Sequence, residues 1–251
     1  GYVDDVHGWN FLGNITQENT EMTRIYKTKD TKNPDYARAK EEYEKEASET
    51  KRNKDFYQQL IETANFADKA VRKIVGKDTY SLEDIEKATK GKSYDAMTTD
   101  MIGFMKELLA RANDNEEIKK ELKEGVDYFD TKLKYHLGLD FSPRKTILKD
   151  DENDFSKKYY GNNNVIGPDS KEALHGTHVA GIIAAERNNG IGMDGVANSV
   201  WIMAVRAVPD GDEYDKDIAL ALRYAVDNGA KVINTSFGKG FSPHKEWVYD
   251  A

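Results

Sequence analysis

The feature that most constrains the fold is a long run, from Asn33 to Leu137, in which apolar residues recur every three or four positions. This spacing places apolar side chains along one face of an α-helix and leaves the abundant Lys and Glu residues on the other face. The first helix is predicted to begin at Pro34 and to stop at Gly76, because proline favours a first helical position and glycine a position just past the end. A break near Asn53 is the alternative to one continuous helix. The run therefore predicts a mostly α-helical region.

Three further helices are predicted in the same run, in SLEDIEKATKG, SYDAMTTDMIGFMKELLARAND and NEEIKKELKEGVDYFDTKLKYHLG. The first of these has Ser81 as N-cap with Asp84 at the third position, a shortened capping box. His136, near the end of the last one, is predicted to have a helix C-terminal or surface role. The middle helix carries an apolar stripe that predicts core packing, with a binding groove as the alternative. The stripe consists of Met97, Met101, Phe104, Met105, Leu108 and Leu109.

The amino-acid composition changes at Gly161, and Gly, Asn, Ala, Val and Ile dominate from there on. SVWIMAVRAV and AKVINTSFG are short apolar runs rich in β-branched residues and predict buried strands. DKDIALALRYAVDNG, between them, predicts a helix that stops at Gly229. Strand, helix and strand in this order form a βαβ unit with a parallel sheet. Since sites in such sheets lie at the carboxyl ends of the strands, residues 208–214 and 236–238 are predicted to share one functional edge.

Composition limits the classes of function. The 251 residues are 38% hydrophobic and 33% charged with a net charge of −8, and no apolar run approaches the roughly 18 residues of a membrane span. The acidic balance disfavours a nucleic-acid partner. Without cysteine the chain has no disulfide and no thiolate chemistry, which is compatible with either redox compartment. The first residues lack the pattern of a signal peptide, and both ends are expected to be cut.

Two histidines stand three residues apart in EALHGTHVAGIIAAERNNGIGMDGVA, at His175 and His178. A helical zinc pair needs two histidines four residues apart with a glutamate base between them, so this spacing disfavours a metal pair. Two capping or core histidines at a helix start are one alternative. The proton-transferring group of an enzyme is the other.

HGTHVAGIIAA, NNGIGMDGVA and VINTSFG together resemble the subtilisin-like serine peptidases, the subtilase family. The resemblance covers residues 161–251 and returns in GYVDDVHGWNF at the N-terminus. It implies an α/β fold, here a partial subtilisin-like parallel sheet flanked by helices, with an all-α inserted domain. The implied organisation is a core segment at residues 1–14, a helical insertion at 15–160, and an incomplete core at 161–251 that ends before the catalytic serine.

The resemblance also implies a serine endopeptidase that hydrolyses peptide bonds by an Asp/His/Ser acyl-enzyme mechanism. His175 is then the general base that takes the serine proton and later protonates the leaving amine, and His178 is a packed structural residue. The implied substrate-binding positions, on the P1 side and the neighbouring edge, are Ser236, Phe237, Gly238 and Gly211.

Only one member of the catalytic triad is expected in these residues. Asp4 and Asp5 lack the D-[ST]-G strand context of the family's aspartate, and Ser236 lies in the substrate strand instead of a G-T-S-M-A-like element. The oxyanion-hole asparagine is also missing, so these residues alone are expected to be inactive. The alternative reading is a pseudoprotease or scaffold whose helical insertion is a protein-binding module.

The insertion is predicted to lie on the surface beside the cleft, since large insertions are tolerated there. One hypothesis is that it acts as a lid that restricts access of folded substrates, or as a docking module that holds a partner protein. The alternative is an additional domain without catalytic consequence. The expected partners are a polypeptide substrate and a protein bound by the helical insertion.

No cofactor is expected to be required. A structural calcium ion with Asn189 as ligand is one expectation for the loop ERNNGIGMDG, and a plain turn is the other. The acidic stretch PDGDEYDKD, on the P2 to P4 side, predicts tolerance for basic substrate residues. Family resemblance implies a secreted or cell-envelope location.

Overall fold

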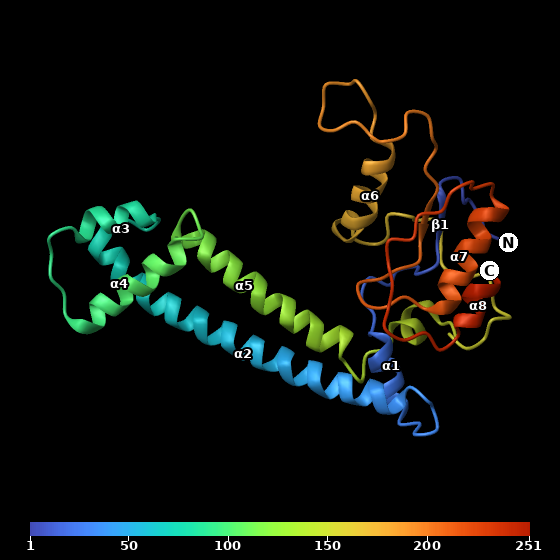
Figure 1. Cartoon of the computed structure of the whole chain (residues 1–251), viewed down its shortest axis with the longest axis horizontal. Helices are drawn as coiled ribbons and strands as arrows, with labels where there is room; N and C mark the ends of the chain where they lie inside the picture. Colours follow the sequence, from blue (N-terminus) through green and yellow to red (C-terminus); the bar gives the residue numbers. More distant parts are fainter. The chain divides into compact units, whose positions relative to one another are not determined.

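The computed structural model describes residues 1–251, which divide into two compact units (Figure 1). The core unit consists of Gly1–Tyr43 together with Tyr135–Ala251, and the helical unit of Glu44–Lys134. None of the helices combines the length and the apolar character that crossing a bilayer requires. The helical unit lies inside the predicted 15–160 segment and contains only helices and their connections. That residues 15–160 are an insertion stays a prediction.

The predicted long helix is confirmed as α2, Tyr36–Val75, which runs through Asn53 without a break. Gly76 follows it with a φ of 76°, a left-handed conformation that glycine adopts without steric cost. In the helical unit α2 lies beside α5, Asn115–Thr131 (Figure 1). A Cβ at Gly125 of α5 would stand 2.4 Å from the Tyr57 ring, so glycine allows this close approach.

The two shorter predicted helices are α3, Leu82–Thr89, and α4, Ala96–Leu109. Ser81 caps α3 by accepting a hydrogen bond from the Asp84 backbone N–H, and the Asp84 carboxylate accepts one from the Ser81 backbone N–H. This confirms the capping box. It leaves α3 with two of its otherwise unsatisfied N-terminal donors bonded.

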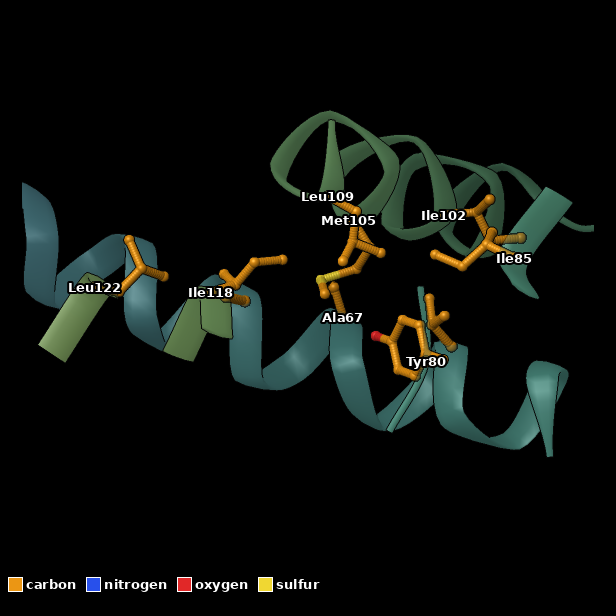
Figure 2. Close-up of a cluster of buried hydrophobic side chains, with 10 residues drawn as sticks. Ala67, Tyr80, Ile85, Ile102, Met105, Leu109, Ile118 and Leu122 are labelled. Atoms are coloured by element: carbon orange, nitrogen blue, oxygen red, sulfur yellow. The ribbon is translucent and has the colours of Figure 1, made fainter. Parts of the chain in front are cut away.

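A single apolar cluster holds the helical unit together (Figure 2). Met105 and Leu109 of the predicted stripe are buried in it, whereas Met97 is 57% exposed. The packing interpretation is therefore confirmed for the inner part of the stripe. The buried members of the cluster are Ala64, Ala67, Val71, Tyr80, Ile85, Ile102, Met105, Leu109, Ile118 and Leu122.

One buried carboxylate, Asp68 of α2, adds a polar centre to this unit. It accepts hydrogen bonds from the Tyr80 hydroxyl at 2.9 Å and from the Asn115 amide at 2.8 Å. It also pairs with Arg72 and Lys119, each at 2.8 Å. Burial alone would raise the pKa of Asp68, but the hydrogen bonds from Lys119, Asn115 and Arg72 hold it below its ordinary value.

The sheet of the core unit has two parallel strands, β1, Gly8–Asn10, and β2, Ala204–Arg206. Gly8 pairs with Ala204 and has a φ of 124°, and a Cβ there would stand 1.8 Å from the Ala204 carbonyl oxygen. Helix α7, Asp215–Asp227, confirms the predicted helix and packs against β2. The buried cluster between sheet and helix consists of Trp9, Phe11, Leu220 and Tyr224.

The remaining elements lie in the core unit, except that the π-helical turn Lys132–His136 begins in the helical unit. They are α1, Glu21–Thr28; α6, Leu174–Ala184; α8, Lys245–Asp250; a single 3₁₀ turn at Ser170–Ala173; and π-helical turns at Lys132–His136 and Arg144–Leu148, the first of which continues from α5. Helix α8 packs on α7 (Figure 1). His136 fits its predicted helix-end position, and its Nε2 lies 3.1 Å from an Asp210 carboxylate oxygen.

Two strand predictions need correction. SVWIMAVRAV forms a strand only at Ala204–Arg206, which is half-buried, and Trp201 is fully exposed. AKVINTSFG forms no strand, and residues 231–238 are exposed. A strand requires a hydrogen-bonded neighbour, and none pairs with this segment. The parallel partner of β2 is instead β1, so the parallel sheet is present but the βαβ unit is not.

Candidate active site

His175 is the second residue of α6. The 3₁₀ turn Ser170–Ala173 leads into this helix, and the Asp169 side chain caps that turn by accepting a hydrogen bond from the Lys171 backbone N–H at 3.0 Å. The His175 side chain is exposed and forms no hydrogen bond with the protein. Its ring nitrogens are thus accessible to a reacting group, as proton transfer requires.

The prediction that His178 is a packed residue is wrong. His178 is exposed, and none of the residues of α6 is buried. The reason is that α6 makes no extensive contact with the sheet; its contacts include the 3₁₀ turn before it and hydrogen bonds from residues 195–197. Both histidines are exposed on the same helix.

The loop after α6 contains the predicted calcium ligand Asn189. Its side-chain oxygen accepts a hydrogen bond from the Ile191 backbone N–H at 2.8 Å. The carboxylate of Asp194 accepts one from the Asn188 backbone N–H at 2.9 Å. These are the bonds of a turn, and the structure brings no group of three or more acidic or histidine side chains together. Calcium binding at Asn189 stays a prediction.

Gly211 lies in the loop that follows β2. This loop extends the parallel pairing, because Glu18 donates its backbone N–H to the Asp210 carbonyl and Asp210 donates to the Thr16 carbonyl, both at 2.8 Å. Gly211 has a φ of 132°, and a Cβ there would stand 2.3 Å from the Glu18 carbonyl oxygen. Glycine is therefore required here for the backbone approach itself. Its role in substrate binding stays a prediction.

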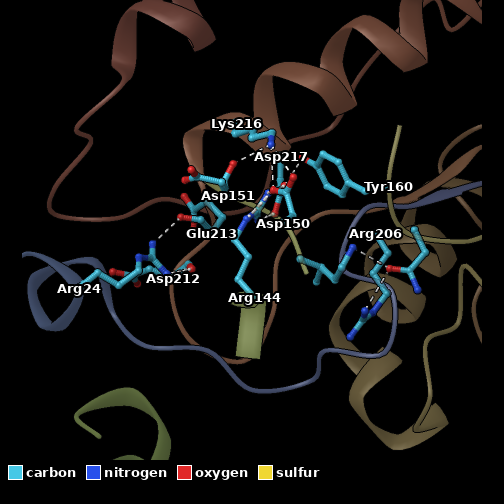
Figure 3. Close-up of polar contacts among 12 residues, drawn as sticks. Arg24, Arg144, Asp150, Asp151, Tyr160, Arg206, Asp212, Glu213, Lys216 and Asp217 are labelled. Carbon is cyan, nitrogen blue, oxygen red and sulfur yellow. Dashed lines mark hydrogen bonds and ion pairs between the residues drawn. The ribbon is translucent and has the colours of Figure 1, made fainter. Parts of the chain in front are cut away.

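The acidic stretch that follows Gly211 does not form an acidic surface. Glu213, Asp215 and Asp217 are buried. Lys239 pairs with Asp215, and Arg144 pairs with Asp217, as Figure 3 shows for the second pair. Asp210, in the same acidic stretch PDGDEYDKD, is 41% exposed, so only part of the charge of the stretch faces inward. Tolerance for basic substrate residues stays a prediction. Sequence shows the charge of a side chain but not the direction in which it points.

Arg144 is the centre of a buried ionic cluster (Figure 3). Its guanidinium donates to both carboxylate oxygens of Asp217, at 2.8 and 2.9 Å, and from Nε to Asp150 at 2.9 Å. Lys216 donates to the same Asp150 carboxylate at 2.8 Å, and the Tyr160 hydroxyl donates to Asp217. Burial would lower the pKa of Arg144, but Asp217 and Asp150 hold it above its ordinary value. This cluster fixes the first turn of α7.

The predicted substrate segment Ser236–Gly238 is exposed. Its one side-chain hydrogen bond is local, from the Asn234 amide to the Ser236 hydroxyl at 3.0 Å. The next residue, Lys239, reaches the Glu213 carbonyl at 2.8 Å and the Asp215 carboxylate at 3.0 Å. The structure thus links this segment to the loop after Gly211. No hydrogen bond or ion pair joins His175 to either of them.

Arg144, Asp150, Lys216 and Lys239 are absent from the sequence predictions of the site. The only sequence feature that could have indicated them is a charged residue directly beside a predicted helix or strand, as in DKD at the start of α7. Charge at such positions usually faces solvent, so the signal is weak. A buried pair between residues far apart in sequence appears only once the fold is known.

Comparisons with known proteins agree with this arrangement of motifs. The model of the subtilase family matches residues 122–249, just over half of the chain. The chain belongs to the subtilase family. The match begins inside α5, upstream of the Gly161 boundary that the motifs indicated. No solved structure matches this subtilase significantly.

Curated relatives of this subtilase match it over shorter stretches. It is 43% identical over 89 residues to the cell wall-associated protease of Bacillus subtilis, covering 35% of this chain and 10% of the relative. It is 55% identical over 65 residues to the thermophilic serine proteinase of a Bacillus species, covering 26% and 16%. It is 46% identical over 65 residues to thermitase of Thermoactinomyces vulgaris, covering 26% and 23%. The chain thus spans less than a quarter of the length of each of these relatives.

Proposed function

We propose that this subtilase is part of a serine endopeptidase in which His175 is the general base. The observation that carries the proposal is the histidine motif HGTHVAG inside the family match, with His175 in the first turn of α6 and its ring exposed. A neutral imidazole there can accept the proton of a serine hydroxyl and return it to the leaving amine. The segment Ser236–Gly238, with Gly211, is proposed to bind the substrate backbone.

The nucleophile, its oxyanion donor and the aspartate that orients His175 are proposed to lie outside residues 1–251. Asp4 and Asp5 are poor candidates for that aspartate. Asp5 accepts a hydrogen bond from the Tyr224 hydroxyl at 2.9 Å, which places this carboxylate beside the C-terminal part of α7. Ser236 is a poor nucleophile candidate, because no histidine contacts it. The 251 residues are therefore proposed to supply the base and part of the substrate site only.

The full-length protein is expected to hydrolyse a mixed peptide library, whereas the 251-residue polypeptide shows no turnover above buffer. The physical reason is that no acyl-enzyme forms without a nucleophile and an oxyanion donor. Folding of the short polypeptide is checked by the fluorescence of Trp9, which is buried in the core unit.

Two outcomes would contradict this. Turnover by the 251-residue polypeptide that His175→Ala abolishes would mean that the nucleophile lies within it. A full-length protein whose sequence lacks the D-[ST]-G aspartate or the G-T-S-M-A serine, and which binds a protein partner without cleaving peptides, would establish the pseudoprotease alternative.

A secreted or cell-envelope location is part of the proposal. Its support is that relatives include a cell wall-associated protease and an extracellular basic protease. Polypeptides are the proposed substrate class for the same reason.

The helical unit is proposed to act as a lid or as a docking module for a protein partner. Removing residues 45–133 from the full-length protein tests the lid role without touching the core unit. The two cut ends are close, because Lys132 and Glu46 form an ion pair at 2.7 Å, so a short Gly/Ser linker can join them.

The deletion is expected to leave cleavage of short peptides within about twofold of wild type and to raise cleavage of folded proteins about tenfold, since a lid restricts large substrates first. The two substrate sizes control for each other in one preparation. Equal rates for both variants on both substrates would show that the helical unit is a decoration.

A further inference from the structure

The segment that precedes Lys239 has almost no support of its own. Residues 231–238 are exposed, pair with no strand, and include Val232 at 88% exposure. The position of Ser236–Gly238 therefore depends on where the chain is next held. That place is Lys239, one residue after Gly238.

Lys239 is anchored in the core unit by three contacts. Its side chain is 5% exposed, and its ammonium donates hydrogen bonds to Glu21 Oε2 and to the Glu213 carbonyl, each at 2.8 Å. It also forms an ion pair with Asp215 Oδ1 at 3.0 Å. A lysine buried in this way with two carboxylates is held in one place.

Asp215, the first residue of α7, extends the attachment further along the chain. Besides Lys239, it accepts hydrogen bonds from the Ser242 hydroxyl at 3.0 Å and from the His244 backbone N–H at 2.8 Å. One carboxylate thus holds three points of the stretch that follows the substrate segment.

A second attachment comes from the start of α2. Arg38 donates to the Gly240 carbonyl at 3.0 Å, and its guanidinium lies 3.8 Å from the centre of the Phe241 ring. Phe241 is itself buried. Glu21 and Arg38 belong to the predicted insertion, yet both hold residues of the predicted peptidase core.

Glu21 is suited to this contact by its charge state. Burial would raise its pKa, but Arg24, with which it forms an ion pair, and Lys239 hold the pKa below its ordinary value. Glu21 is therefore ionised at neutral pH and attracts the ammonium of Lys239.

We propose that Lys239 is a positioning residue for peptide binding, which fixes the Ser236–Gly238 segment by linking it to Glu21 of α1 and Asp215 of α7. The inference rests on the proposed function, because it assigns that segment to substrate binding. It also implies that α1 and the start of α2, which belong to the predicted insertion, contribute to substrate affinity. This contribution does not depend on whether the helical unit acts as a lid.

The kinetic test uses the full-length protein and the variants Lys239→Met, Lys239→Arg and Lys245→Met. Lys239→Met removes the charge but keeps most of the unbranched side chain, and Lys245 is an exposed lysine of α8 that serves as the matched control. For Lys239→Met we expect KM for peptides to rise about tenfold with kcat within about twofold, because the binding-competent segment is then populated only part of the time. Lys239→Arg should recover most of this rise, and Lys245→Met should behave as wild type.

Limited proteolysis of the 251-residue polypeptide separates the inference from the proposed function. In Lys239→Met, chymotrypsin should cut after Phe241, which is buried in wild type, at least about tenfold faster, while cleavage within α5 of the helical unit is unchanged. A KM in Lys239→Met equal to that of Lys245→Met, or unchanged cleavage after Phe241, would overturn the positioning role. A wild-type protein that cleaves no peptide would refute the proposed function alone, since chymotrypsin still measures whether Lys239 orders this stretch.

Discussion

Replacing His175 with alanine in the full-length protein lowers kcat/KM for peptides by an expected factor of about 10⁴ to 10⁶, because a general base and its nucleophile act as one unit. KM should change little, since the exposed imidazole forms no hydrogen bond that supports the core unit. The measurement is steady-state hydrolysis of one peptide by matched preparations of both proteins.

His178→Ala is the matched control for this prediction. His178 lies three residues further along the same exposed helix and also forms no hydrogen bond with the protein, so helix propensity and exposure are comparable. It should retain kcat/KM within a few-fold of wild type. Equal losses in the two variants would show that the motif supports the structure and is not the source of the base, which would defeat the assignment of His175.

Replacing Arg144 with methionine should destabilise the core unit by about 3–5 kcal/mol, because it leaves a buried carboxylate without its cation. Asp217 would keep only the Tyr160 hydroxyl, whereas Asp150 would still pair with Lys216. The free energy of unfolding is measured on the 251-residue polypeptide by denaturant titration, with tryptophan fluorescence as the reporter, since all three tryptophans lie in the core unit and Trp9 is buried there.

Two further variants sharpen this result. Arg223→Met breaks an ion pair with Asp250 whose side chains are 37% and 80% exposed, and should cost about 1 kcal/mol or less. Arg144→Met combined with Asp217→Leu should recover most of the loss, since no isolated charge then remains buried. If Arg144→Met costs no more than Arg223→Met, the cluster does not hold the first turn of α7 as described.

The helices were predictable because their signals are local. Gly76 ends α2 by its own conformation, and Ser81 with Asp84 caps α3 within four residues of chain. A strand depends instead on a neighbour from elsewhere. AKVINTSFG has a strand-like composition but no paired neighbour, whereas Gly8–Asn10 gained one in β2 although its composition gave little indication of a strand.

The candidate site divides in the same way. The family and the position of His175 at a helix start were predictable, because a short motif carries both and both are local properties. The burial of His178 was wrongly predicted because packing depends on what covers a helix, and nothing in HGTHVAG shows that. Lys239 was missed because its partner Glu21 is more than two hundred positions away in sequence.

The buried charges of the core unit also constrain how this subtilase can vary. Arg144, Asp150 and Lys239 each pair with a residue encoded in a distant part of the chain, namely Asp217, Lys216 and Glu21. A recombination event that exchanged residues 15–160 as one block would separate these partners, and each orphaned charge would count against folding. Exchange of residues 45–133 would separate none of them. We therefore expect chimaeras with related enzymes, natural or engineered, to fold when the crossovers lie near residues 45 and 133. Chimaeras with crossovers near residues 15 and 160 are expected to be destabilised.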